Sequence, residues 1–266
     1  MSSSKRIAVK VGTSTLTHAN ATLNLRQMEN LVRVLSDLKS AGHDVILVSS
    51  GAIAVGVQKL RLPGRPEELR VKQAAAAVGQ CQLMHLYDKF FSEYNVSVGQ
   101  ILLTRDDVER ESVRESLLNT FHAMLELGVI PIVNENDSVS HEEIESSEKI
   151  FGDNDTLSAI VAEMCQADLL VLLSDIDGLF ERDPRTDPTA KMITEVHVLD
   201  DALRQSAMGA GTWRGTGGMV TKLQAAEICM NAGIDMVITN GDNPQSLYEL
   251  AAGKQMGTLF YGKKGN

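Results

Sequence analysis

Two lysines stand where the chain could bind an anion. Lys10 interrupts an apolar run, Ile7 to Val11, that has the composition of a buried strand. A desolvated ammonium group is costly there without a partner, but at the carboxyl end of a strand it can reach an anionic ligand. Lys10 taken alone could equally extend its amine into water, as many lysines do. The presence of a second lysine, Lys222, favours an anion site.

Lys222 closes the run Gly215-Thr216-Gly217-Gly218-Met219-Val220-Thr221-Lys222. Glycines before a helix expose backbone amides, and the positive end of the helix adds to their attraction for phosphate. A tight turn before a helix is the simpler alternative. The run is neither a P-loop, which needs Gly-Lys-Ser or Gly-Lys-Thr after a fixed gap, nor a Rossmann Gly-x-Gly-x-x-Gly. We therefore expect a phosphate site of another type.

A possible carboxylate partner stands in Gly152-Asp153-Asn154-Asp155-Thr156, which opens a predicted helix. Asp and Asn are ordinary helix caps, worth about 1 kcal/mol each against alanine. One cap explains one residue, but not three consecutive polar side chains near the Asn134-Glu135-Asn136-Asp137 segment. Asp155 placed between two lysines could fix their positions. The pattern leaves capping and a functional role equally open.

Short β-branched and leucine-rich runs alternate with segments of helical period, which predicts an α/β fold with right-handed βαβ units. The strands are almost wholly apolar, as strands covered on both faces should be, so we expect a mainly parallel sheet. The predicted strands are Ile7 to Val11, Val45 to Val48, Gln100 to Leu103, Ile130 to Val133, Leu169 to Leu173 and Met236 to Ile238. The predicted helices are Leu25 to Ser40, Glu67 to Tyr94, Val113 to Leu127, Asp155 to Cys165, Met219 to Ala232 and Pro244 to Ala252, several of them closed by a glycine.

Polar loops follow these strands, and the ligands of open α/β sheets lie beyond the carboxyl ends of the strands. Turn propensity explains any one such loop, but their recurrence after successive strands favours a ligand site. The loops are Gly12 to Ser14, Ser49 to Ala52, Asn134 to Asp137, Ser174 to Gly178 and Asn240 to Asp242.

Composition excludes several other classes of protein. The net charge of -10 and the 4% aromatic content fit poorly with nucleic-acid binding. No apolar run approaches membrane-spanning length, so we expect no membrane partner and a cytoplasmic protein. We interpret Cys81, Cys165 and Cys229 as buried thiols rather than disulfides or a metal site. The histidines are scattered, and no Gly-x-Ser-x-Gly elbow is present, which argues against zinc and serine-hydrolase chemistry.

Read in order, these motifs resemble those of the glutamate 5-kinases, within the amino acid kinase family. The resemblance implies a three-layer αβα sandwich of the carbamate kinase type spanning residues 1–266. Residues 1–168, approximately, would bind the acceptor, and residues 169–260 the nucleotide. Many such kinases continue into a PUA domain; because this sequence stops at Asn266, we expect that domain to be absent. The motifs are Val9 to Ser14, Val48 to Ile53, Val133 to Asp137, Gly152 to Asp155, Asp175 to Gly178 with Asp183-Pro184, and Gly215 to Lys222.

The resemblance also implies an activity: ATP-dependent phosphorylation of the side-chain carboxylate of L-glutamate to L-glutamyl 5-phosphate, the first step of proline biosynthesis. A carboxylate with a pKa of about 4.3 is ionised near neutrality and needs no general base, so positioning and charge neutralisation should suffice. ATP and Mg²⁺ are implied, with the Mg²⁺ carried by ATP rather than by protein ligands. A homo-oligomer, inhibition by proline and a transient contact with a glutamyl phosphate reductase are implied as well.

Site residues follow from the same resemblance. Lys10 and Lys222 match the lysines that neutralise the transferred phosphoryl group, and Asp155 matches the carboxylate that organises them. The glutamate-binding positions are Ser50, Asp137 and Asn154, with Asn134 nearby; the nucleotide-binding positions are Lys10, Ser174, Asp175, Thr216, Gly217, Gly218, Met219, Val220, Thr221 and Lys222.

Alternatives remain open at this point. Related kinases phosphorylate N-acetylglutamate, aspartate, carbamate or UMP, although Ser49 to Ala52 replaces the consecutive glycines usual in N-acetylglutamate kinases. A nucleotide or amino acid sensor would keep the fold and lack turnover, and a nicotinamide-dependent dehydrogenase would need a glycine fingerprint after the first strand, which is missing. The charged segment Gln58 to Gln73 is either a mobile element over the acceptor pocket or a plain solvated loop.

Overall fold

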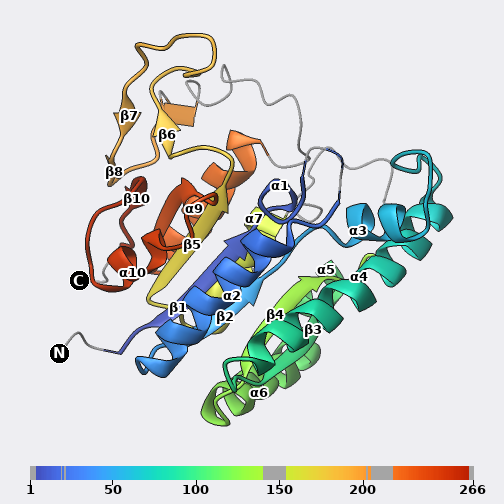
Figure 1. The fold of residues 1–266 in the computed structure, drawn as a ribbon. Helices are drawn as coiled ribbons and strands as arrows, with labels where there is room; N and C mark the ends of the chain where they lie inside the picture. The colour runs from blue at the N-terminus through green and yellow to red at the C-terminus, as the bar shows by residue number, and fades with distance from the viewer. Residues whose placement is uncertain are drawn as a thin grey trace.

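The computed structural model describes residues 4–18, 20, 22–139, 154–201, 203–204 and 218–263. Its main sheet has eight strands in the order β3-β4-β2-β1-β5-β9-β10-β8 (Figure 1). The first six strands in this spatial order, β3 through β9, are parallel to one another. Strand β10 is antiparallel to β9, and β8 pairs with β10 in the parallel direction. The bounds are β1 Arg6–Val11, β2 Asp44–Val48, β3 Val98–Leu103, β4 Ile130–Glu135, β5 Leu169–Ser174, β8 Glu195–Val196, β9 Asp235–Asn240 and β10 Thr258–Phe260; a separate antiparallel pair is formed by β6 Leu179–Phe180 and β7 Met192–Ile193.

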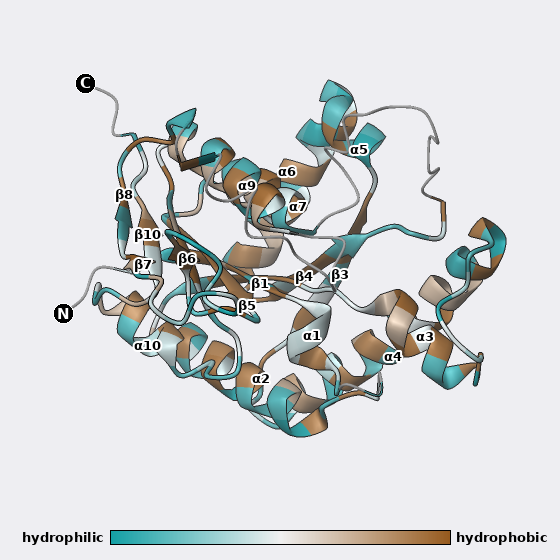
Figure 2. Cartoon of the chain, turned by 90° about the horizontal axis from the view of Figure 1, so that it is seen from above, coloured by the Kyte–Doolittle hydropathy of each residue, from teal (hydrophilic) through white to brown (hydrophobic). Residues whose placement is uncertain are grey.

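Helices cover both faces of this sheet because successive side chains of each strand point to opposite sides. Ala8 belongs to a core cluster that includes residues of α6, α7 and α9, whereas Val9 belongs to a second cluster that includes residues of α2, α4 and α10. Figure 2 shows the sheet between these two helical layers. The predicted mainly parallel αβα sandwich is therefore confirmed. The helices are α1 Thr13–Leu16, α2 Leu25–Ser40, α3 Ala52–Lys59, α4 Leu69–Ser92, α5 Arg105–Glu109, α6 Glu111–Glu126, α7 Asn154–Met164, α9 Met219–Asn231 and α10 Ser246–Ala251.

Every strand and helix predicted from the sequence is present, with ends shifted by a few residues. The helices α2, α6 and α9 are each followed by a glycine with positive φ, at Gly42, Gly128 and Gly233. The short elements α1, α3, α5, β6, β7, β8 and β10 were not predicted. Strands of two or three residues are too short to show a period, and α1 begins within the polar Gly12 to Ser14 segment, whose composition indicates a turn.

Two of the three cysteines predicted to be buried are buried in the structure, and the third is exposed. Cys165 and Cys229 are buried, and burial raises the pKa of each thiol to about 12. Cys81 is exposed, so its prediction as a buried thiol is wrong. Its neighbour Gln80 takes the buried position on α4, and consecutive helical residues point about a quarter turn apart. In the portion of the chain that the structure describes, no helix is long and apolar enough to cross a membrane.

Helices α3 and α4 pack backbone against backbone, which fixes the start of α3 beside the strand ends. A Cβ atom on Gly79 would lie 1.8 Å from the carbonyl oxygen of Ala52, and a Cβ atom on Gly56 would lie 1.7 Å from that of Ala75. Only glycine allows so close an approach at these two positions.

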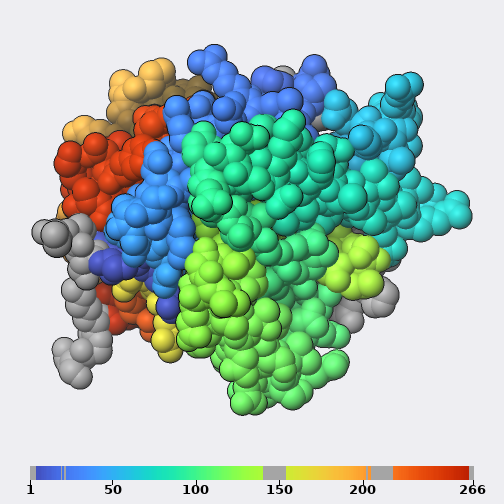
Figure 3. Space-filling view, turned by 60° about the horizontal axis from the view of Figure 1, so that its bottom comes forward, coloured from blue at the N-terminus to red at the C-terminus, as the bar shows by residue number. Residues whose placement is uncertain are grey.

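The charged segment Gln58 to Gln73 includes the end of α3 and the start of α4, and only residues 60–68 between the two helices are not helical. Figure 3 shows this connection, in cyan, projecting from one edge of the molecule.

Replacing Gly79 by alanine should force α3 and α4 apart. The added methyl group collides with backbone atoms rather than with a flexible side chain, so we expect a loss of about 3 kcal/mol in the free energy of unfolding, the upper range for overpacking. Urea unfolding followed by circular dichroism measures the loss. Gly64→Ala is the matched control, since a Cβ atom on Gly64 meets no atom within 4 Å. Equal stability of the two variants would contradict the close packing.

Candidate active site

The parallel strands β4, β2, β1 and β5 are neighbours, so their carboxyl ends lie at one edge of the sheet. This edge carries five polar side chains that the strands present together. Asn134 lies in β4, Ser49 and Ser50 follow β2, Lys10 is the penultimate residue of β1, and Ser174 ends β5. All five are buried.

A buried carboxylate joins the two lysines. Lys10 lies on the same face of β1 as Ala8, toward α7 and α9. The Nζ atom of Lys10 lies 2.6 Å from Oδ1 of Asp155, and the Nζ atom of Lys222 lies 3.0 Å from Oδ2. The side chain of Asp155 is 0% exposed, and the lysine side chains are 10% and 8% exposed. Three charged groups from β1, α7 and α9 thus form one compact centre.

The charge of Asp155 is maintained by its partners. Burial by itself would raise the pKa of this carboxyl group, but the ammonium groups of Lys10 and Lys222 outweigh burial and hold the pKa below its ordinary value. The hydroxyl group of Thr221 also donates a hydrogen bond to Oδ2, at 3.1 Å. Asp155 is therefore an ionised strut that keeps two cations at fixed positions.

Beside this centre lies a cluster of neutral polar groups around Asn154. Its Nδ2 atom lies 2.6 Å from the carbonyl oxygen of Ser49, 2.7 Å from Oγ of Ser50 and 3.0 Å from Oδ1 of Asn134. The structure thus brings together three of the four residues predicted to bind the acceptor. Asp137, the fourth, is half-buried in the turn that follows β4. A rigid group of amide and hydroxyl side chains can bind a small polar molecule.

The first two residues of α7 connect the two groups. Asn154 belongs to the neutral cluster and Asp155 to the charged centre, so they are adjacent in the chain as well as in space. A molecule held by the neutral cluster would therefore lie next to the two lysines. This arrangement suits a reaction in which an anionic group is transferred to a bound polar molecule.

The predicted nucleotide-binding residues occupy the carboxyl end of β5 and the start of α9. Buried Ser174 donates a hydrogen bond to exposed Asp175 at 3.1 Å. Gly218 caps α9, whose first turn begins with Met219. Val220 is exposed, whereas Thr221 and Lys222 face Asp155. Thr216 and Gly217, like Gly152 and Asp153, lie outside the described residues.

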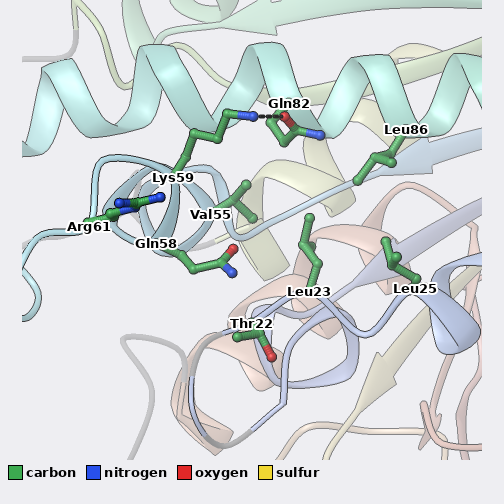
Figure 4. Close-up of a pocket in the computed structure, with 9 residues that line it drawn as sticks. All are labelled: Thr22, Leu23, Leu25, Val55, Gln58, Lys59, Arg61, Gln82 and Leu86. Carbon is green, nitrogen blue, oxygen red and sulfur yellow. Dashed lines mark hydrogen bonds between the residues drawn. The ribbon is translucent and has the colours of Figure 1, made fainter.

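A separate cavity of about 450 Å³ lies between α3, α4 and the chain before α2 (Figure 4). At one side, the Nζ atom of Lys59 donates a hydrogen bond to Oε1 of Gln82 at 3.0 Å. None of the predicted site residues lines this cavity, so it is distinct from the charged centre. Its lining consists of Thr22, Leu23, Leu25, Val55, Gln58, Lys59, Arg61, Gln82 and Leu86.

Two buried polar side chains of α4 also reach the site and are not among the residues predicted from the sequence. The amide of Asn134 donates to Oε1 of Gln80 at 2.9 Å, and the hydroxyl groups of Ser49 and Tyr87 lie 2.9 Å apart. The sequence feature that could have indicated their burial is the seven-residue spacing between Gln80 and Tyr87. Residues seven apart share one face of a helix, and that face of α4 is otherwise apolar or small.

Solved structures of other proteins share this fold. The fold matches that of carbamate kinase from Giardia lamblia, with a TM-score of 0.68 at 16% identity over 99% of this chain and 100% of the other. It also matches UMP kinase from Bacillus anthracis, with a TM-score of 0.64 at 15% identity over 98% and 97% of the two chains. These similarities show the fold, an αβα sandwich of the carbamate kinase type.

The chain belongs to the amino acid kinase family, whose profile matches residues 5–240. It is 55% identical to the glutamate 5-kinase of Clostridium perfringens over 98% of this chain and 97% of that relative. It is 53% identical to the glutamate 5-kinase of Carboxydothermus hydrogenoformans, covering 98% of this chain and 68% of the relative.

Proposed function

We propose that the chain transfers the γ-phosphoryl group of ATP to the side-chain carboxylate of L-glutamate and forms L-glutamyl 5-phosphate. The observation that carries this proposal is the buried Lys10–Asp155–Lys222 centre beside the Ser50–Asn134–Asn154 cluster, in a chain that is 55% identical to a glutamate 5-kinase. Glutamate is the acceptor that these relatives are named for, and glutamyl phosphate is the first intermediate on the route to proline.

The charged centre supplies what this reaction needs. A carboxylate oxygen of glutamate attacks the γ-phosphorus, a new O–P bond forms, and the bond from the γ-phosphorus to the bridging oxygen breaks as ADP leaves. No proton has to move, because the attacking carboxylate is already ionised near neutrality. Two anions must approach each other, so Lys10 and Lys222 act by neutralising the transferred group at positions that Asp155 fixes.

The acceptor and the phosphoryl donor bind to two different parts of the chain. Ser50, Asn134, Asn154 and Asp137 hold the acceptor in residues 1–168, and residues 169–260 hold ATP. Ser174, Asp175 and residues 216–222 are the nucleotide contacts. The first turn of α9 supports this assignment, because a helix of 13 residues begins there with Lys222 aimed at the centre.

Mg²⁺ would enter the site bound to the triphosphate. The donor chemistry of the centre fits this arrangement, since both oxygens of Asp155 face lysines and ammonium groups do not bind metals. Among the described residues, no group of three His, Cys, Asp or Glu side chains gathers into a metal site. When bound, the ion would offset charge on the phosphate oxygens while the lysines and backbone amides orient them.

The remaining expectations concern the setting of the enzyme. We propose a cytoplasmic homo-oligomer that is inhibited by proline, which resembles a cyclised glutamate and would compete at or beside the acceptor cluster. The acyl phosphate product is reactive, so a glutamyl phosphate reductase is the expected next protein, through a transient contact.

ADP release in the presence of ATP and Mg²⁺ tests the proposed function. We expect release with L-glutamate, and not with N-acetylglutamate, aspartate or no acceptor, and we expect hydroxylamine to trap the acyl phosphate as a hydroxamate. If ADP were released only with another acceptor, that acceptor and not glutamate would be the substrate. Binding of ATP without release under every condition would indicate a sensor.

A further inference from the structure

Helix α4 lines the acceptor side of the sheet with two buried polar groups. Gln80 is 8% exposed and Tyr87 is 0% exposed. Gln80 reaches β4 through Asn134, and Tyr87 reaches the segment after β2 through Ser49. One rigid helix therefore contacts both segments that supply the neutral cluster.

The contact through Gln80 continues as a directed chain of amides. Oε1 of Gln80 accepts a hydrogen bond from Nδ2 of Asn134 at 2.9 Å. Oδ1 of Asn134 then accepts from the backbone N–H of Glu135 at 2.9 Å and from Nδ2 of Asn154 at 3.0 Å. Asn134 therefore uses its donor end toward Gln80 and its acceptor end toward Glu135 and Asn154. The acceptor oxygen of Gln80 thus supports the orientation of Asn134 in which Oδ1 faces Glu135 and Asn154.

Reversing this chain would be costly. If the amide of Asn134 turned over, its NH₂ group would face the NH₂ group of Asn154 and the backbone N–H of Glu135. Asn154 could not turn in response, because its Nδ2 atom also donates to the carbonyl oxygen of Ser49 at 2.6 Å. Buried donors would then face donors, which loses hydrogen bonds without replacement.

Tyr87 secures the other end of the cluster. Burial raises the pKa of this phenol above its ordinary value, so Tyr87 stays a neutral hydroxyl group. Its hydroxyl lies 2.9 Å from Oγ of Ser49. The backbone carbonyl of Ser49 in turn accepts a hydrogen bond from Nδ2 of Asn154. The backbone N–H of Glu135 and the backbone carbonyl of Ser49 set the polarity of the amide chain, and Gln80 completes it by accepting from Asn134. Tyr87 fixes the position of the segment after β2.

We propose that Gln80 is a positioning residue for the acceptor site, which rests on the proposed glutamate kinase function. Gln80 holds the NH₂ group of Asn134, so Oδ1 of Asn134 joins the protein oxygens around the NH₂ group of Asn154. The hydroxyl of Ser50 accepts from Asn154 at 2.7 Å, so its own hydrogen is left to donate to a carboxylate of the bound amino acid. Oδ1 of Asn154 is left to accept from its ammonium group. Gln80 thus supports, through Asn134, the side-chain orientations in which these groups meet the acceptor, without touching it.

Gln80→Met and Gln80→Glu test this role by steady-state kinetics. Methionine keeps the shape of glutamine and removes the oxygen that accepts from Asn134, whereas glutamate restores an oxygen at that point. We expect Gln80→Met to raise the KM for glutamate about 10-fold, equal to about 1.4 kcal/mol, with the KM for ATP changed less than about twofold. Gln80→Glu should recover most of the loss. Gln82→Met, two residues along α4 and bonded only to surface Lys59 among described residues, is the matched control and should leave both KM values unchanged.

Two results would overturn the proposal. One is an unchanged KM for glutamate in Gln80→Met. The other is a rise in both KM values together with a lower melting temperature and no recovery in Gln80→Glu, which would show that Gln80 only supports the fold. The wild-type protein is measured first in the same assay, so absence of glutamate-dependent ADP release there would reject the proposed function itself.

Discussion

Asp155→Asn is expected to lower turnover by about 10² to 10³-fold and to destabilise the fold. Asparagine has nearly the same shape, so packing is kept and only the charge is lost. Both Lys10 and Lys222 then lose their anionic partner in a site that is almost closed to water. Removing one partner of a buried ion pair costs about 3–5 kcal/mol, and misplacing two transition-state cations removes the stabilisation that preorganised donors provide. Turnover and urea unfolding measure the two effects separately.

The same substitution should change how stability depends on acidity. The pKa of folded Asp155 is held below the unfolded value of about 3.9. Its contribution is therefore present above that unfolded value and is lost as pH falls through the lower folded value. Asp155→Asn should flatten this acid limb when urea unfolding is compared between about pH 3 and pH 7.

Asp44→Asn provides the control for both measurements. Asp44 pairs with Arg6 and Lys39 at the opposite end of β2, where its side chain is 33% exposed. Surface pairs contribute about 0–1 kcal/mol, so this variant should retain turnover and lose little stability. If the two variants behaved alike, Asp155 would not be the strut between the lysines.

The sequence was sufficient to predict the framework of the site. Apolar runs ending in polar loops predicted the parallel strands, and the carboxyl ends of such strands meet at one edge whatever the details of packing. Lys10 could be placed there because a lysine within an apolar strand needs a partner. Its partner could not be derived from the pattern alone, since Lys222 lies 67 positions beyond Asp155 and helix packing decides which face of each helix meets the sheet.

Ser49 and Ser50 illustrate what local patterns leave out. They are consecutive and chemically identical, and the resemblance assigned an acceptor role to Ser50 alone. In the structure, the hydroxyl of Ser49 faces Tyr87 in the core, whereas the hydroxyl of Ser50 faces Asn154. Their separation depends on the path of the backbone after β2, where Gly51 takes a positive φ at the start of α3. Such a path is set by the packing of α3 on α4 and has no signature in two serines.

Helix α4 was predicted, but its inner face was not. Small residues such as Ala75 and Gly79 line that face, so its amphipathic period is weak and the spacing of Gln80 from Tyr87 is a faint sign of burial. The same weakness led to the wrong placement of Cys81. Period-based reasoning works where large apolar side chains mark one face, as in α2, and fails where close packing relies on small ones.

Lys10→Met and Lys222→Met should each lower turnover by on the order of 10²-fold, the usual effect of removing one preorganised transition-state donor. Methionine keeps most of the apolar stem and removes the charge. The KM for glutamate should change little, because the neutral cluster around Asn154 does not depend on either ammonium group. Lys39→Met is the control, since Lys39 is a half-buried lysine whose partner, Asp44, lies far along the strand from the site. Unchanged turnover in a folded Lys10→Met or Lys222→Met variant would reject the proposed role of that lysine.

Stability should rank these variants differently from turnover. Lys222→Met leaves Lys10 and Asp155 as a balanced pair at 2.6 Å, whereas Asp155→Asn leaves two buried cations without an anion. We therefore expect Lys222→Met to cost less unfolding free energy than Asp155→Asn, although both should abolish most turnover. The double variant Asp155→Asn/Lys222→Met leaves one cation instead of two and should be more stable than Asp155→Asn alone, a coupling that urea unfolding of the full cycle measures. If the losses of stability were simply additive, the three groups would not act as one electrostatic unit, and Asp155 would be a separate helix cap.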